Sequence, residues 1–532
     1  MRSAFIKNAA ILTVTSLLLR VVGMLFRVYM SNAIGAEGMG LYQLIVSVYV
    51  LVSTFASSGI STAVTRMVTD ELVKGSRASL RRLMGIAVVI SVGIGLLSFA
   101  VIALAAEPIA LWFIKDTRAI PALRILGSGL PFMGLSACIK GYFLARRQVA
   151  GNSGAQLLEQ AARIGCIWLL LSRFGNGDAA TSCACIMIGD NVAEGLSCLY
   201  MCACYLRDKG RIRALLPDTG PRRPVLRPLA AIAVPLAAGR YLTTFLHTAE
   251  NLLVPRRLAQ YSGSQEQALA SFGTLKGMAL PLLFFPSSFL SAFSTLLIPE
   301  MTEAQSRGQA QKVKWAAERT LHLTLWAAIG FAGVFIVLAY PLGRLLYNSE
   351  EVGFLLTVLA PLIPAMYAES VADGLLKGLG QQVVSFKVHV IDSAVRIVLI
   401  LLLVPRFGMA GFLFVMIVSN LLSSFLNLHH LLTVTGARPP LWRCLLGPIL
   451  SAVTAGLGIH ILTPFAGIDT ESPLYLLFAA GGMLLVYLLL TWLFGCIGKR
   501  DLQGFSATGS PVTTAIPTCE PHTPLLPLDR IV

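Results

Sequence analysis

The sequence has 532 residues, of which 56% are hydrophobic and 13% are charged, and its mean hydropathy is +0.75. Soluble domains contain about 25% charged residues, so this composition excludes a soluble globular protein. The net charge of +16 would suggest nucleic-acid binding in a soluble protein, but in a membrane protein basic residues collect in cytoplasmic loops. We therefore expect no nucleic-acid partner.

The first apolar stretch follows Arg2 and Lys7 and resembles a signal peptide over a few residues. Because Arg20 and Arg27 interrupt it and no small-residue cleavage site precedes the next helix, we interpret it as a retained first helix. The following apolar runs reach the roughly 20 residues that a helix needs to cross a bilayer. The pattern predicts an all-α integral membrane protein with about fourteen transmembrane helices, near 9–31, 42–65, 83–105, 121–145, 155–172, 180–206, 228–254, 268–298, 320–343, 352–376, 384–404, 409–433, 443–464 and 473–496.

Basic residues gather in alternate loops: at the N-terminus, in 66–82, 146–147, 207–227 and 299–319, and at 499–500. The positive-inside rule then predicts a multi-pass protein of the cell membrane with both termini in the cytoplasm. The chain divides into an N-lobe with helices 1 to 6 (1–206), a basic cytoplasmic linker (207–227), a C-lobe with helices 7 to 12 (228–433), helices 13 and 14 (434–496) and a disordered cytoplasmic tail rich in Pro, Thr and Ser (497–532).

The ten cysteines do not predict a disulfide framework or a metal site. Five of them lie in or beside one apolar run, at Cys183, Cys185, Cys198, Cys202 and Cys204. Cysteine in such a run behaves as a small hydrophobic residue. No histidine pair stands at a matching zinc-type spacing, so we expect no metal and no cofactor.

The two lobes resemble each other in sequence at one constant offset, the spacing between Leu123 and Leu356. Five unlike residues, Leu123, Pro131, Met133, Gly141 and Gln148, recur as Leu356, Pro364, Met366, Gly374 and Gln381, and Glu159 and Arg163 recur as Asp392 and Arg396. A weaker match at a different offset pairs Arg20 with Arg240 and Arg27 with His247. Since each unit holds an even number of helices, we expect two parallel six-helix pseudo-repeats with a substrate site between them, as in transporters.

Several charges fall inside predicted spans, where insertion of a charge costs at least about 2.5–3.5 kcal/mol. Arg20 and Arg27 are separated by two helical turns and therefore share one helix face, and Arg240 and His247 repeat this spacing. Together with Lys276, these side chains are the predicted substrate-binding residues, because arginine forks bind phosphate oxygens bidentately. The alternative is that they reach the membrane interface or pair with Glu250 in a packed core.

The remaining charges stand at i, i+4 positions, a spacing that brings side chains together on a helix. Glu159 with Arg163, and Asp392 with Arg396, are most simply explained as pairs that neutralise each other. Glu250 and Asp392 are also candidates for a coupling-ion site for Na⁺ or H⁺, since carboxylates suit hard cations.

Three segments carry a resemblance to a known family: LRVVGMLFR at 19–27, GAEGMGLYQ at 35–43 and GISTAV at 59–64. They resemble the stage V sporulation protein B branch of the polysaccharide-biosynthesis flippases. That branch is similar to the MurJ-like lipid II flippases and belongs to the multidrug/oligosaccharidyl-lipid/polysaccharide exporter superfamily. The resemblance implies a central cationic cavity between two lobes, two C-terminal helices forming a groove for a lipid tail, and export of an undecaprenyl-pyrophosphate-linked sugar.

The same resemblance assigns some residues. The family's functional arginines in helix 1 correspond to Arg20 and, with a small difference in spacing, to Arg27. Its basic residue in helix 8, followed five positions later by proline, corresponds to Lys276 and Pro281. The family's arginine leading into helix 2 has no counterpart here, which leaves the identity of the lipid cargo open.

We therefore expect a flippase for a lipid-linked anionic oligosaccharide or peptidoglycan precursor that works by alternating access, acts as a monomer and contacts membrane lipids. A cation-coupled multidrug antiporter of the MATE type is the alternative on the same fold, but arginine-lined cavities do not suit cationic drugs. An intramembrane glycosyl or phosphoglycosyl transferase is the alternative of another class, and it would need a cluster of carboxylates or histidines at a membrane face. No nucleotide-binding loop is present, so we expect a transporter that is neither an enzyme nor an ATPase.

Overall fold

The computed structural model describes residues 2–57, 59–74, 77–175, 178–215, 224–466 and 472–498. Across these ranges the chain is helical and contains no strand. Most of the predicted tail, from residue 499, and the middle of the predicted linker, 216–223, lie outside the described residues. The described ends of that linker are helical as far as Leu215 and again from Leu226.

The described part of the first half consists of α-helices and one π-helical turn. They are α1 (Arg2–Ser57), α2 (Ile60–Lys74), α3 (Arg77–Pro108), η1 (Ile109–Ile114), α4 (Ala119–Gly127), α5 (Leu130–Ala145), α6 (Val149–Phe174) and α7 (Ala179–Leu215).

The second half begins with the long helix α8 and ends with two helices that, among the described residues, have no counterpart in the first half. Its elements are α8 (Leu226–Ser262), α9 (Gln265–Gly273), η2 (Thr274–Ala279), α10 (Leu280–Phe284), α11 (Ser287–Ser306), α12 (Ala310–Val337), α13 (Ala339–Tyr347), α14 (Glu350–Leu359), η3 (Ala360–Leu362), α15 (Ile363–Gly378), α16 (Gln382–Thr435), η4 (Trp442–Leu446), α17 (Gly447–Ala466) and α18 (Pro473–Leu493).

Within the described ranges, nine helical stretches are long and apolar enough to cross a membrane. Two of the helices are bent at a glycine whose backbone is not helical. Gly35 in α1 has a φ of 71° and Gly408 in α16 has a φ of 58°, a region that a residue without Cβ adopts readily. Each of these elements therefore consists of two helices joined at a kink, where the sequence predicted two separate spans.

The internal repeat is confirmed by the backbone. The offset that takes Leu123 to Leu356 also takes α5 (Leu130–Ala145) onto α15 (Ile363–Gly378). Left-handed backbone is uncommon at residues other than glycine, yet Lys115 with φ 60° is matched at the same offset by Asn348 with φ 49°. One register thus relates both the helices and the turns of the two halves.

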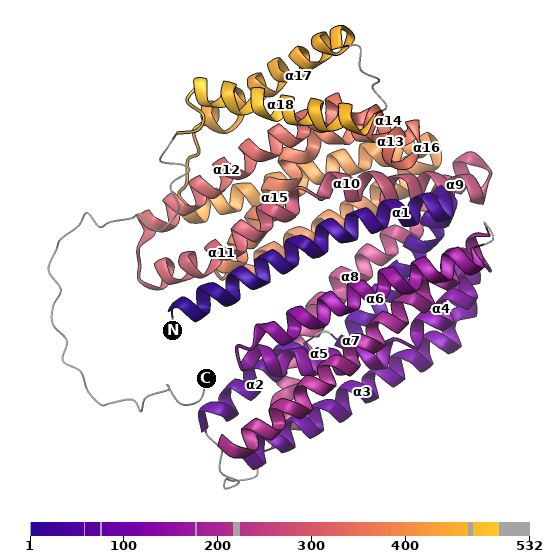
Figure 1. The fold of residues 1–532 in the computed structure, drawn as a ribbon, viewed down its shortest axis with the longest axis vertical. Helices are drawn as coiled ribbons and strands as arrows, with labels where there is room; N and C mark the ends of the chain where they lie inside the picture. The colour runs from indigo at the N-terminus through magenta and orange to yellow at the C-terminus, as the bar shows by residue number, and fades with distance from the viewer. Residues whose placement is uncertain are drawn as a thin grey trace, which may run out of the picture.

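The two halves form separate groups of helices (Figure 1). Helices α2–α7 make one group, α9–α16 make the other, and α1 and α8 run between them. The helices α17 and α18 lie on the outer side of the second group, against α12. There Tyr487 donates a hydrogen bond to the carbonyl of Trp326 over 2.6 Å, which anchors α18 to α12.

The halves are in close contact near the kink of α1, a region we call the Gly35 end. An added Cβ at Gly40 would lie 2.0 Å from the carbonyl oxygen of Leu269, and one at Gly273 would lie 2.0 Å from the carbonyl oxygen of Ala36. Such distances are far below van der Waals contact, so the backbones of α1 and α9 meet directly. Only glycine at these two positions allows the halves to close together here.

Candidate functional site

Helix α8 belongs to the second half but packs on α1 of the first half. Thr248 donates a hydrogen bond to the carbonyl of Ser47 over 3.0 Å, and Asn251 Nδ2 donates to the hydroxyl of Ser47, also over 3.0 Å. Nearer the start of α8, an added Cβ at Gly59 would lie 2.3 Å from the carbonyl oxygen of Ala233. Side chains of α8 that point away from this contact are therefore presented to the second half.

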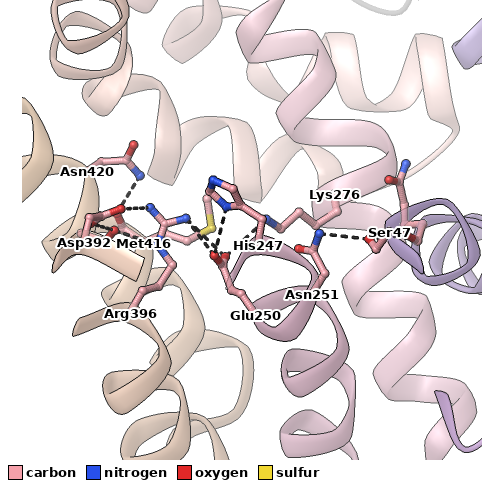
Figure 2. A network of polar contacts seen from close by, with 11 residues as sticks. Ser47, His247, Glu250, Asn251, Lys276, Asp392, Arg396, Met416 and Asn420 are labelled. Carbon is pink, nitrogen blue, oxygen red and sulfur yellow. Dashed lines mark hydrogen bonds and ion pairs between the residues drawn. The ribbon is translucent and has the colours of Figure 1, made fainter. Parts of the chain in front are cut away.

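Glu250 is the centre of a charged network on that opposite face (Figure 2). Its side chain is only 2% exposed. Arg396 Nη1 lies 3.3 Å from Oε1 and 3.2 Å from Oε2 of Glu250. Lys276 Nζ of η2 lies 3.6 Å from Oε1, and His247 Nδ1 lies 3.8 Å from Oε2. Three helical elements thus contribute cationic or titratable groups to a single buried carboxylate.

Arg396 also holds together the two parts of the kinked helix α16. Its Nη2 lies 2.7 Å from Asp392 Oδ2, and its Nε donates to the hydroxyl of Ser419 over 2.8 Å. Ser419, beyond the kink, also hydrogen-bonds to Asp392. The two carboxylates Glu250 and Asp392 are balanced by the two cations Arg396 and Lys276. Such balance, with hydrogen bonds, makes buried charge tolerable.

The first half contains the corresponding arginine at the repeat offset. Arg163 Nη2 lies 3.0 Å from Glu159 Oε1, which repeats the pairing of Arg396 with Asp392. Its Nε lies 2.7 Å from Asp190 Oδ1 of α7. The i, i+4 pairs are therefore present in both halves, and in each the arginine also reaches a carboxylate on another helix.

The predicted substrate-binding residues divide into two groups. Lys276 and His247 belong to the Glu250 network, where their side chains are 22% and 55% exposed. Arg20 and Arg240 are exposed and Arg27 is partly buried. In the part of the chain that the structure describes, no carboxylate forms an ion pair with Arg27 or Arg240. Both predicted coupling-ion carboxylates, Glu250 and Asp392, are bound by Arg396.

The face of α1 that carries Arg20 and Arg27 lies beside α6. Gly23 stands between Arg20 and Arg27 on the same helix face, and an added Cβ there would lie 3.8 Å from Gln160 Nε2 of α6. Gln160 in turn accepts a hydrogen bond from Arg163 over 3.2 Å. The Arg20–Arg27 face of α1 is therefore close to Arg163 and its ion pairs.

Sequence reasoning missed two parts of this arrangement. It paired Arg396 with Asp392 alone, whereas Arg396 also bridges to Glu250, which is 146 residues away. It did not single out Asp190, although an acidic residue in the apolar run 180–206, which also contains Glu194, is a signal that it could have used.

Comparison with known proteins agrees with this fold. The family model described as polysaccharide biosynthesis protein matches residues 5–305. Stage V sporulation protein B of Bacillus subtilis is 23% identical over 442 residues, covering 82% of this chain and 85% of that protein. The lipid II flippase MurJ of the same organism is 23% identical over 427 residues, covering 75% of this chain and 77% of that protein.

Solved structures show the same architecture. An inward closed conformation of lipid II flippase MurJ matches with a TM-score of 0.70 at 15% identity, covering 92% of this chain and 98% of that one. An inward-facing multidrug resistance MATE transporter of the MOP superfamily matches with a TM-score of 0.61 at 14% identity, covering 80% and 98%. With a family model that covers more than half of the sequence, the chain belongs to the polysaccharide biosynthesis protein family, and it has the membrane-transporter fold shared by MurJ and MATE proteins.

Proposed function

We propose that the protein is a flippase that moves a lipid-linked, pyrophosphate-bearing oligosaccharide or peptidoglycan precursor across the cytoplasmic membrane by alternating access. In this proposal the chain crosses the membrane about fourteen times, both termini and the 207–227 linker face the cytoplasm, and a monomer suffices. The protein transports its substrate without changing it chemically. Its membership of the family, and the names of its relatives MurJ and stage V sporulation protein B, support this assignment.

The observation that carries the proposal is that the cations around Glu250 are paired with carboxylates, whereas two arginines elsewhere in the bundle are not, among the residues that the structure describes. Around Glu250, two carboxylates and two cations neutralise each other. Arg27 and Arg240, on the two helices that run between the halves, have no carboxylate partner among the described side chains. Unpaired guanidinium groups within a membrane require an anion or water. A pyrophosphate supplies that anion, and the guanidinium fork matches its oxygens.

The closed Gly35 end supports alternating access. In the proposed orientation this end faces away from the cytoplasm, so the substrate enters from the cytoplasmic side. Release on the far side then requires α1 and α9 to separate at Gly40 and Gly273. Closely packed backbones without interlocking side chains can separate and re-form, as rocking of two repeats requires.

The test is transport of a fluorescent undecaprenyl-pyrophosphate sugar in proteoliposomes containing the full-length protein. We expect Arg27→Ala and Arg240→Ala to lower the flipping rate at least about tenfold, because loss of one charge-assisted contact of about 1.5–3 kcal/mol corresponds to that factor or more. Arg27→Lys should recover part of the rate, since lysine retains the charge but not the fork. Arg20→Ala tests the same face of α1.

Arg173→Ala, at the end of α6, is the matched control and should transport normally. Full activity of the Arg27 and Arg240 alanine variants, at equal protein levels, would remove the support for an anionic substrate. Transport of cationic drugs in place of the lipid would instead indicate a multidrug exporter.

A further inference from the structure

Two buried hydroxyl groups lie at the Gly35 end, one on each side of the contact between α1 and α13. Asn32 of α1 donates a hydrogen bond to the carbonyl of Leu346, in the last turn of α13, over 2.9 Å. The next residues in the chain are Ser31 and Tyr347, which are only 2% and 6% exposed. The Asn32 hydrogen bond therefore brings Ser31 and Tyr347 to the same part of the interface between the halves.

Neither hydroxyl has a hydrogen-bond partner among the residues that the structure describes. A serine in a helix commonly donates to the carbonyl four residues earlier, as Ser47 of the same helix does to Gln43 over 2.7 Å. The Ser31 hydroxyl makes no such bond within the described chain. Buried polar groups without a partner are rare in native proteins, and they point to a ligand or to another conformation that pairs them.

The other half shows that packing does not require these two hydroxyls. At the repeat offset Tyr347 corresponds to Ile114, which is buried at 2% exposure, so the fold accepts an aliphatic side chain at this position. At the weaker offset Ser31 corresponds to Asn251, which donates a hydrogen bond to Ser47. One position is therefore apolar and the other is hydrogen-bonded in the matching half, whereas Tyr347 and Ser31 each bury an unpaired hydroxyl among the described residues.

Arg27 adjoins the two hydroxyls. It precedes Ser31 by one helical turn and therefore shares a face of α1 with it. It also acts electrostatically on Tyr347 from across the interface, and among the described side chains it has no carboxylate partner. A guanidinium group only donates hydrogen bonds, and a hydroxyl can donate as well. Three donors from the two halves can thus converge on a group that only accepts, such as a phosphate oxygen.

We propose that Arg27, Ser31 and Tyr347 form an exit subsite, which binds the phosphate oxygens of the substrate as the Gly35 end opens. The identity of the substrate rests on the proposed flippase function, whereas the subsite rests on the contacts above. Because both hydroxyls are buried while the end is closed, the subsite becomes accessible only when α1 and α13 separate. A ligand that binds one of two states shifts the equilibrium toward that state. Pyrophosphate therefore favours the opening through which it leaves.

The first experiment follows this opening with inorganic pyrophosphate and without any lipid. Spin labels at positions 117 and 350, which are exposed and equivalent in the two halves, report the separation of the halves in the full-length protein. The first position is next to Arg118, which pairs with Glu37 of α1 over 2.6 Å. The second is next to Glu351, which accepts a hydrogen bond from a threonine of η2 over 3.4 Å. Both labels therefore lie at the Gly35 end.

We expect pyrophosphate to increase the open fraction of the wild type several-fold. Tyr347→Phe and Ser31→Ala remove one hydroxyl each, and the double variant should lose most of this response. Tyr340→Phe is the matched control and should respond as the wild type does, because Tyr340 is an exposed tyrosine of the same helix.

Unfolding of the same variants separates a role in binding from a role in the fold. Neither hydroxyl is hydrogen-bonded to a described residue in the closed structure, so its removal eliminates an unpaired buried group. Tyr347→Phe and Ser31→Ala should therefore unfold at the same or a higher denaturant concentration than the wild type. A structural role would instead lower that concentration.

The second experiment measures flipping of a fluorescent undecaprenyl-pyrophosphate sugar in proteoliposomes. Each single variant should lower the flipping rate roughly two- to tenfold, the factor that corresponds to one hydrogen bond. In an Arg27→Ala background Tyr347→Phe should have a smaller effect, because groups that bind the same phosphate do not act additively.

The outcomes separate the subsite from the flippase assignment. If the double variant flips lipid at the wild-type rate and responds to pyrophosphate as the wild type does, the exit subsite fails and the flippase assignment stands. If the wild type flips no lipid but pyrophosphate opens its Gly35 end through Ser31 and Tyr347, the flippase assignment fails and the subsite stands. A loss of stability that accompanies the loss of transport would make the hydroxyls structural and would also overturn the subsite.

Discussion

Replacing Arg396 by methionine tests whether the ion pairs of Arg396 with Asp392 and Glu250 stabilise the fold. Arg396 neutralises Asp392 across 2.7 Å and contacts both oxygens of Glu250. In its absence Glu250 still has Lys276 at 3.6 Å, whereas only the hydroxyl of Ser419 remains on Asp392. Removing one partner of a buried pair typically destabilises by about 3–5 kcal/mol. We expect Arg396→Met to lower the free energy of unfolding by about that amount, since the Asp392 side chain is only 7% exposed.

The assay is reversible unfolding in mixed detergent micelles, with Asp392→Asn as the second mutation of a double-mutant cycle. If the destabilisation arises from the unpaired carboxylate, Arg396→Met with Asp392→Asn should be more stable than Arg396→Met alone by about 2 kcal/mol or more. Arg163→Met is the matched control from the first half. It should be less destabilising, because Arg163 is 31% exposed against 16% for Arg396. A loss below about 1 kcal/mol for Arg396→Met, or no recovery in the double variant, would refute this reasoning.

Three further predictions follow from contacts elsewhere in the chain. Gly40→Val places a side chain where a Cβ alone would lie 2.0 Å from the Leu269 carbonyl oxygen. Spin labels at positions 32 and 346, which are in contact across the Gly35 end in the structure, should therefore report wider separations in this variant. Gly85→Val is the control and should leave the separations unchanged, because nothing lies within 4 Å of a Cβ at Gly85. Asp178 accepts hydrogen bonds from the backbone N–H and the hydroxyl of Thr181 at the start of α7, and these bonds hold the pKa of Asp178 below its ordinary value of 3.8. Asp178→Ala should lower the free energy of unfolding by about 1 kcal/mol at neutral pH. This difference between variant and wild type should vanish as the pH falls through the lowered pKa, because the wild-type carboxylate is then protonated. Tyr142→Phe removes a buried 2.7 Å hydrogen bond to Asp208 and should lower the unfolding free energy by about 1–3 kcal/mol, whereas Tyr340→Phe, at an exposed tyrosine, should change it little.

Much of the architecture could be predicted from the sequence because its causes are local. An apolar run long enough to cross a bilayer forms a helix wherever it stands, since lipid cannot satisfy its backbone hydrogen bonds. The repeat could be recognised in the sequence because matching residues recur at the same spacing in both halves. Glu159 and Arg163, for example, recur as Asp392 and Arg396. The same pairs appear in the structure as intrahelical ion pairs.

The partners of the intramembrane charges depended on the tertiary structure. Glu250 and Arg396 are 146 residues apart in the sequence. No sequence pattern predicts that α8 packs one face against α16 and another against α1. That choice follows from packing, including the direct backbone contact of Gly59 with Ala233 of α8. The sequence by itself determined that charges lie inside the membrane and that arginines share helix faces. Only the folded chain decided which of the described charges are paired with a carboxylate and which, such as Arg27 and Arg240, are not, because long-range ion pairs form between helices that packing brings together.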